Sequence, residues 1–280
     1  MPTERFDVPL PDGTRLAGER RPAAGAPTVV LLHAGVADRR AWSAVIGLLD
    51  GDHLDLIASD RRGYGDTPRA TGGFTHLDDL VAVLDAAGAE RAVVVGNSMG
   101  GALALDLALT RPDRVSSVLL VGGAVSGMTD EGEAVEWAPD EATGPILSAL
   151  ERAEQANDVD EQVRLELHLW LDGPTAPEGR VGGAARELAA AMNRRVLEAG
   201  TVGSDGDAGL DTWHRLGEIA APVLATWGSL DLPPDLPFYG ITADRLANAE
   251  ARVLDGVAHL PSLERPQLVA DLIREAVARA

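Results

Sequence analysis

The residue of this sequence best placed to form a covalent bond is a serine between two glycines. The order is Gly96-Asn97-Ser98-Met99-Gly100-Gly101, with an apolar β-branched run at residues 92–95 before it and an Ala/Leu-rich run after it. That order predicts a sharp turn from a buried strand into a helix, which lifts the serine side chain out of the sheet. The glycines have no Cβ and so leave room for the strand and the helix to approach each other. The pattern indicates Ser98 as a nucleophile.

A serine hydroxyl needs a neighbouring base, usually a histidine that a carboxylate orients. Of the six histidines in the chain, His259 lies in a loop between a short strand pattern and the last helix pattern. Folds with parallel sheets place their catalytic groups in loops of this kind, at the carboxyl ends of the strands. We therefore expect His259 to be the base. His33, at the end of an earlier strand, is expected to brace its turn by hydrogen bonds.

The carboxylate partner is expected on a loop between the serine and the histidine. Asp231 follows a strand pattern at residues 222–226 and a turn that contains Gly228. Asp231 would accept a hydrogen bond from the ring of His259, fix its tautomer and stabilise the imidazolium. Asp235 is the main alternative, and Asp130 is a weaker one.

Acyl transfer also requires backbone N–H groups that stabilise a developing oxyanion. The N–H of Met99, directly after the serine, is expected to supply one of them. The second is expected from the loop His33-Ala34-Gly35-Val36-Ala37, which follows a buried strand pattern. Gly35 is the candidate donor and Val36 is the alternative.

Strand-like and helix-like segments alternate along much of the chain, which is typical of a mostly parallel sheet with helices on both faces. An opening hairpin is expected from residues 6–10 and 15–20. Further strands are expected at residues 28–33, 54–59, 115–121, 222–226 and 251–254. Helices are expected at residues 42–49 and 77–87, from the serine to residue 109, and from residue 266 onward.

Residues 129–211 differ in composition from the rest of the chain, because they are rich in Glu, Asp, Ala and Gly. They contain helical patterns at residues 146–156, 163–171 and 184–197. The predicted organisation is therefore a core of residues 1–126 and 213–280 with an inserted helical cap at residues 127–212. Residues expected to line a substrate pocket under this cap are Val36, Trp137, His168 and Trp170.

Composition narrows the function classes. An apolar content of 45% fits a globular protein, and a formal net charge of −20 would repel nucleic acid and anionic membranes. Without cysteine there is no disulfide framework and no thiolate metal site. Nothing at the start resembles a signal peptide, so a cytoplasmic location is expected. We expect a monomer or homodimer that acts on a small molecule, with no metal and no cofactor.

Together these pieces resemble the α/β-hydrolase superfamily, in particular small capped bacterial hydrolases. That group includes esterases, enol-lactonases, C–C bond hydrolases and cofactor-free haloperoxidases. The matching motifs are His33-Ala34-Gly35, Asp60-Arg61-Arg62-Gly63-Tyr64-Gly65, Gly96-Asn97-Ser98-Met99-Gly100-Gly101, Trp227-Gly228-Ser229-Leu230-Asp231 and Gly256-Val257-Ala258-His259. The resemblance implies the α/β-hydrolase fold, the chain order Ser, Asp, His and a cap over the triad. Ala34 departs from the family, which usually has glycine there.

The leading hypothesis is a serine hydrolase that cleaves a carboxylic ester, thioester or lactone of a small, largely apolar substrate through an acyl-enzyme on Ser98. One alternative is a C–C bond hydrolase of a ring-fission diketone, because Asn97 and the residues after Ser98 resemble those enzymes. Against that alternative, Leu260 follows His259 where those enzymes typically carry tryptophan. The other alternative is a hydrolase-like ligand sensor that keeps an intact triad.

Overall fold

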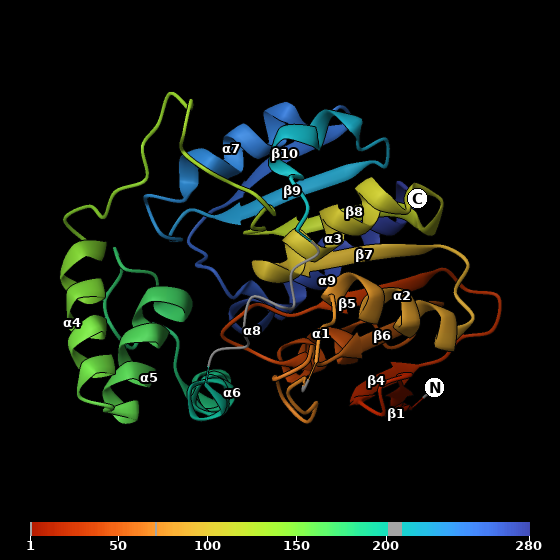
Figure 1. Ribbon diagram of the computed structural model, residues 1–280, viewed down its shortest axis with the longest axis horizontal. Coiled ribbons are helices and arrows are strands. Elements are labelled where there is room, and N and C mark those ends of the chain that lie inside the picture. The colour runs from red at the N-terminus through yellow and green to blue at the C-terminus, as the bar shows by residue number, and fades with distance from the viewer. Residues whose placement is uncertain (1, 71, 201–208) are drawn as a thin grey trace.

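The computed structural model describes residues 2–70, 72–200 and 209–280, and a mostly parallel sheet forms its centre (Figure 1). Within these residues eight strands form one sheet in the order β1-β4-β6-β5-β7-β8-β9-β10. Its strands are β1 (Glu4–Arg5), β4 (Gly18–Arg21), β5 (Thr28–Leu32), β6 (Asp55–Ser59), β7 (Ala92–Asn97), β8 (Val115–Val121), β9 (Val223–Gly228) and β10 (Ala249–Leu254). Neighbours from β6 to β10 pair in parallel, whereas β1 pairs with β4 and β4 with β6 in antiparallel fashion. The predicted fold class is confirmed.

Helices cover both faces of the sheet. Because the side chains on both faces of its strands are buried, these strands appear in the sequence as continuous runs of apolar residues. Along β5, Val30 and Leu32 face one apolar cluster and Val29 and Leu31 face the other. The first cluster lies under α2 (His76–Ala87), α3 (Met99–Thr110), α7 (Leu236–Arg245) and the turn η5 (Trp213–Glu218). The second lies under η1 (Arg39–Trp42), α1 (Ser43–Leu48) and α9 (Pro266–Ala278).

Three helices form an insertion between β8 and β9, and Figure 1 shows them to one side of the sheet. They are α4 (Thr143–Gln155), α5 (Val159–Leu167), which continues into the π-helical turn η3 (His168–Asp172), and α6 (Gly183–Ala199). We call residues 143–199 the helical insertion. One apolar cluster joins its Leu167, Leu171 and Met192 to Ala34 and Leu260 of the core. The insertion is therefore held over the loops that follow β5 and β10.

Two of the differences between the structure and the sequence-based prediction concern the opening hairpin and α7. The strand expected at residues 15–20 is split into β3 (Arg15–Leu16), which pairs with β2 (Val8–Pro9), and β4, because the N–H of Ala17 donates to the side chain of Thr67 at 2.8 Å. Helix α7 was not predicted. Proline is tolerated in the first turn of a helix, where N–H groups have no partner, so Pro237 does not prevent this one.

Short elements complete the described chain, namely η2 (Pro112–Arg114) and α8 (Pro261–Glu264). Among the residues described, no helix combines the length and apolar character needed to cross a membrane.

Candidate active site

Ser98 occupies the turn between β7 and α3 in a strained backbone conformation, with φ 55° and ψ −121°. The close packing around it explains the glycines. A Cβ on Gly96 would lie 2.6 Å from Cα of Gly101, and one on Gly101 would lie 2.6 Å from Cα of Gly123. A Cβ on Gly100 would lie 2.7 Å from the carbonyl carbon of Leu32. The strand-to-helix turn expected from the sequence is therefore present, with the serine at its apex.

His259 and Asp231 form a buried pair. The two atoms Nδ1 of His259 and Oδ2 of Asp231 are 2.8 Å apart, and the residues are only 5% and 1% exposed. Because an ionised carboxylate only accepts hydrogen bonds, Nδ1 carries the proton and Nε2 is left as the basic nitrogen. Asp231 is itself held, since its Oδ1 accepts from the N–H of Leu232 at 2.8 Å and its Oδ2 from the hydroxyl of Tyr239 at 3.1 Å.

The electrostatic setting favours the protonated form of His259. Burial alone would lower the pKa of His259, but the charge of Asp231, the hydrogen bond to it and the charge of Asp235 outweigh burial and raise this pKa above its usual range. Asp235 does not replace Asp231 beside the ring. Its Oδ1 accepts from the indole Nε1 of Trp137 at 2.7 Å, and burial raises the pKa of Asp235.

Three residues without a predicted role hold the pair in place. Asn97, directly before the serine, donates from Nδ2 to the carbonyl of Val121 at 2.7 Å and to that of His259 at 3.0 Å. Gly122 has φ 52°, and a Cβ there would lie 3.0 Å from Oδ2 of Asp231 and 3.1 Å from Nδ1 of His259. Tyr239 contacts Asp231 as described above. The one signal in the sequence is the pair Gly122-Gly123 directly after a strand pattern.

The loop after β5 is braced as the sequence indicated. His33 accepts the N–H of Arg61 at its Nε2 (3.1 Å), and its Nδ1 lies 2.8 Å from the carbonyl oxygen of Ala34. Burial, followed by the charge of Arg61, holds the pKa of His33 well below its usual range, so the ring is neutral and serves as a structural brace. The methyl group of Ala34 belongs to the apolar cluster beneath the insertion. That packing gives a reason for alanine where the family usually has glycine.

Free N–H groups gather next to Ser98. Gly35 lies against Met99, so that a Cβ on Gly35 would lie 2.6 Å from the sulfur of Met99. The N–H groups of Gly35, Val36 and Met99 donate to no acceptor in the described part of the chain. All three therefore remain available to an oxyanion, and the geometry does not separate Gly35 from Val36.

The loop that follows β6 is braced by charge, as the sequence indicated. Asp60 accepts the N–H groups of Arg39 and Asp66, each at 2.8 Å, and pairs with the Arg39 guanidinium. Burial raises the pKa of Asp60 to about 6 despite these bonds. Arg62 holds Asp79 with two bonds of 2.7 and 2.9 Å. These contacts fix the loop that carries Tyr64.

A cavity of about 580 Å³ opens between the core and the helical insertion. Its core side is lined by Gly35, Val36, Tyr64 and Met99. Its other side is lined by Glu154, Gln162, Glu166, Val196, Leu197 and Gly200. Because Met99 and Gly35 carry the candidate oxyanion donors, this cavity adjoins the reacting position at Ser98.

The expected pocket residues lie in different places. Val36 lines the cavity, whereas Trp137, His168 and Trp170 do not. Trp170 packs against His259, with ring centroids 4.8 Å apart, and so covers the candidate base. Trp137 is 39% exposed beside Asp235. His168 lies within the insertion, its Nε2 3.1 Å from the carbonyl oxygen of Ala176.

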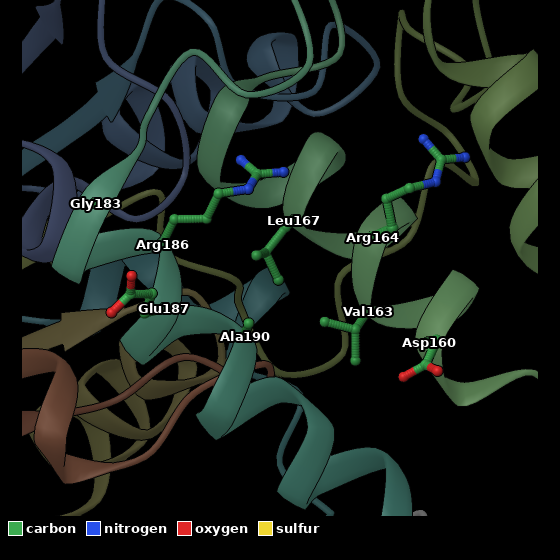
Figure 2. Close-up of a pocket in the computed structure, with 8 residues that line it drawn as sticks. All are labelled: Asp160, Val163, Arg164, Leu167, Gly183, Arg186, Glu187 and Ala190. Atoms are coloured by element: carbon green, nitrogen blue, oxygen red, sulfur yellow. The ribbon is translucent and has the colours of Figure 1, made fainter.

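A smaller pocket of about 390 Å³ lies between α5 and α6 (Figure 2). Its charged lining mixes both signs, with Asp160 and Glu187 beside Arg164 and Arg186. Figure 2 shows that all its lining side chains come from the insertion, and none is a predicted site residue. In the described ranges no group of three or more His, Asp or Glu side chains is arranged to hold a metal ion.

A family model for the alpha/beta hydrolase fold matches residues 27–266, and the chain belongs to this family. It is therefore a hydrolase by family. Among its curated relatives, a 2-hydroxy-6-oxononadienedioate/2-hydroxy-6-oxononatrienedioate hydrolase of Paraburkholderia phymatum is 28% identical over 87% of this chain and 84% of its own length. A pimeloyl-[acyl-carrier protein] methyl ester esterase of Neisseria meningitidis is 29% identical over 89% of this chain and 76% of its own length.

Solved structures agree with this assignment. Est816, described as an N-acyl homoserine lactone degrading enzyme, is 28% identical with a TM-score of 0.72, covering 96% of this chain and 99% of its own. The esterase RhEst1 from Rhodococcus sp. ECU1013 is 26% identical with a TM-score of 0.73, covering 99% of each chain. Relatives of this chain thus include esterases, a lactone-degrading enzyme and a 2-hydroxy-6-oxononadienedioate hydrolase.

Proposed function

We propose that this chain is a serine hydrolase that cleaves a carboxylic ester, thioester or lactone of a small substrate through an acyl-enzyme on Ser98. The observation that carries the proposal is the buried His259–Asp231 pair, because it leaves Nε2 of His259 as a base. The bond from Asn97 to the carbonyl of His259 ties that base to the residue next to the serine.

In the first half of the reaction, Nε2 of His259 takes the proton of the Ser98 hydroxyl as its oxygen attacks the substrate carbonyl carbon. Negative charge develops on the carbonyl oxygen, where the free N–H groups of Met99 and of Gly35 or Val36 stabilise it. Asp231 stabilises the imidazolium that forms. When the tetrahedral intermediate collapses, His259 returns the proton to the leaving alcohol or thiol, and the acyl group stays on Ser98.

In the second half, a water molecule takes the place of the leaving group. His259 removes its proton, the resulting hydroxide attacks the acyl carbon, and the ester bond to Ser98 breaks. The proton then passes to the Ser98 oxygen and the carboxylic acid leaves. Relatives described as a methyl ester esterase and as a lactone-degrading enzyme support carboxyl esters as the bond type.

A C–C bond hydrolase is the second candidate, supported by the relatives described as 2-hydroxy-6-oxononadienedioate hydrolases. Both reactions would use the same serine hydrolase site. The two candidate functions therefore differ in the substrate bond that is cleaved, an ester bond or a C–C bond. The proposed substrate is a small molecule in either case.

The test is a panel of short p-nitrophenyl esters, lactones and a ring-fission diketone, run on the wild type and on Ser98→Ala. We expect steady ester or lactone turnover above about 1 per second, a usual enzyme rate, and its loss in Ser98→Ala together with loss of fluorophosphonate labelling. Ser43→Ala, at an exposed serine on α1, is the matched control and should keep both.

Each other outcome of this panel contradicts the proposal in its own way. Undiminished labelling of Ser98→Ala would move the nucleophile elsewhere. Cleavage of the diketone alone would establish the C–C reaction. Slow, stoichiometric release without turnover would favour the ligand sensor.

A further inference from the structure

The two sides of the cavity beside Ser98 differ in their chemistry. The core side presents backbone N–H groups. The insertion side presents hydrogen-bond acceptors, on the carboxylates of Glu154 and Glu166 and on the amide of Gln162. Among the described lining residues there is no Arg, Lys or His. A group in this part of the cavity therefore meets acceptors and negative charge.

Glu166 is fixed in position. It lies on α5, and its Oε2 accepts from Nδ2 of Asn193 on α6 at 2.5 Å. Asn193 is buried, with 2% exposure, so it holds the carboxylate from behind. Burial and then the nearby charge of Glu154 raise the pKa of Glu166, whereas the bond from Asn193 lowers it. No described arginine contributes to the shift, and among the described residues no cation pairs with this carboxylate.

Gln162, one helical turn before Glu166, supplies a separate indication. It is 8% exposed, and its Nε2 donates to the carbonyl of Ala153 at 3.4 Å. That bond leaves its Oε1 as the free end of the amide, and no donor within the described residues reaches it. This oxygen is not one of the buried side-chain atoms without a partner, so water can reach it, and a donor on a bound molecule can take the place of that water.

Arg69 lies at the rim of the cavity, beside Gly200, and has another partner. A Cβ on Gly200 would lie 3.2 Å from Nη1 of Arg69, and this atom donates to the carbonyl of Ala199. Arg69 is thus bound to the end of α6, and it does not line the cavity.

Resting on the proposed serine hydrolase function, we propose that Glu154, Gln162 and Glu166 form a subsite for a cationic or N–H-bearing group of the substrate. The scissile carbonyl lies at Ser98, and an ammonium or amide group at the far end of the same substrate meets the acceptors of the insertion. A second carboxylate at that end is excluded by like charge. The substrate class is therefore esters or lactones with a distal hydrogen-bond donor, not half-esters of dicarboxylic acids.

The test compares p-nitrophenyl esters that differ only at the far end of the acyl chain. A series of increasing length carries a terminal primary ammonium group, the neutral methyl group of the same size, or a carboxylate. At the best length we expect kcat/KM for the cation to exceed that for the neutral, methyl-ended ester by about tenfold, and the carboxylate to be slower than both. No preference for the cation at any length would overturn the subsite.

Variants test whether Glu154 and Glu166 cause the preference for the cationic ester. In the double variant Glu154→Gln with Glu166→Gln, the ratio of cation to neutral kcat/KM should fall to about twofold or less. Glu151→Gln removes an exposed carboxylate from the same helix as Glu154 and should keep the ratio. Glu154 is exposed, so Glu154→Gln alone serves if the double variant does not fold, with a smaller loss expected. A ratio that survives these changes contradicts the proposal.

A binding experiment separates this inference from the proposed reaction. Calorimetry of Ser98→Ala with hexylammonium and with hexanoate should show tighter binding of the cation, lost with Glu154→Gln and Glu166→Gln. If the cation binds in this manner while no ester is cleaved by the wild type, the serine hydrolase proposal fails and the subsite stands. If esters are cleaved and the cation does not bind more tightly, the subsite fails and the hydrolase proposal stands.

Discussion

The side-chain amide of Asn97 donates to the main-chain carbonyl of His259 at 3.0 Å. This bond joins the residue before the candidate nucleophile to the candidate base, although the two are 162 positions apart in the chain. The same nitrogen donates to the carbonyl of Val121 at 2.7 Å. Asn97 thus ties the end of β7 to the end of β8 and to the loop after β10.

Replacing Asn97 by alanine should misplace His259 relative to Ser98. Loss of both bonds leaves the carbonyl of His259 without this donor, whereas that of Val121 keeps the N–H of Ser98 at 3.1 Å. A displacement of the base by about 1 Å can cost about a hundredfold in rate. We expect kcat of Asn97→Ala to fall by about tenfold to a hundredfold, with KM changed far less, measured on a p-nitrophenyl ester. Asn248→Ala, at an exposed asparagine, is the control and should keep wild-type kcat. An unchanged kcat in Asn97→Ala would show that this bond does not position the base.

The rise of the rate on the acidic side of the pH–rate profile, its acidic limb, should reflect the pKa of His259. Its pKa is raised above the usual 6.5, and the base acts only when neutral, so kcat/KM should rise with pH through that pKa and level off above it. Asp235 is one of the charges that raise the pKa, so Asp235→Asn should move the limb to lower pH. The amide oxygen of asparagine can still accept from Trp137, which keeps the local structure.

Asp244→Asn is the matched control for that profile, because Asp244 is an exposed carboxylate on α7, the helix that begins directly after Asp235. Its limb should coincide with that of the wild type. A limb unmoved by Asp235→Asn, or moved equally by both variants, would exclude Asp235 as the source of the shift.

Much of the fold could be predicted from the sequence, because local pattern dictates it. The alternation of apolar strands and amphipathic helices follows from a sheet buried on both faces, and the order of Ser98, Asp231 and His259 follows from the motifs around them. The sequence favours Asp231 over Asp235, but their contacts depend on tertiary packing, which places Asp231 beside His259 and Asp235 beside Trp137.

The residues on the insertion side of the cavity could not be predicted from the sequence, for a different reason. Glu154, Gln162 and Glu166 lie on helices of the insertion, where polar residues normally indicate a face in contact with water. Their position over Met99 depends on how α4 and α5 pack against the core, and that packing leaves no local pattern. Gly122 likewise becomes significant only because β8, Asp231 and His259 meet at one point.

The glycine after the serine turn should be intolerant of a single methyl group. A Cβ on Gly100 would lie 2.7 Å from the carbonyl carbon and 2.9 Å from the Cβ of Leu32, so α3 would be forced away from β5. We expect Gly100→Ala to lower the free energy of unfolding by about 3 kcal/mol, measured by urea denaturation. Gly47→Ala on α1, where no heavy atom besides the chain neighbours and the helix's own backbone lies within 4 Å of the added methyl, should instead raise it by about 0.5–1 kcal/mol. Equal effects of the two changes would contradict the close approach of α3 to β5.

The strain at Ser98 should be measurable as stability. A non-glycine residue at φ 55° and ψ −121° costs about 1–3 kcal/mol, which glycine avoids. Glycine loses more backbone entropy on folding, by about 0.5–1 kcal/mol, so part of the gain is offset. We therefore expect Ser98→Gly to be more stable towards urea than Ser98→Ala by about 1 kcal/mol, although both should be inactive.

Ser43, at φ −57° and ψ −42° on α1, provides the reverse case. In that helical conformation glycine is unfavourable, so Ser43→Gly should be less stable than Ser43→Ala by about 1 kcal/mol. The opposite order of the glycine and alanine variants at the two serines is the result that identifies backbone strain. If alanine is the more stable replacement at both positions, Ser98 stores no strain, and its geometry costs the fold nothing to maintain.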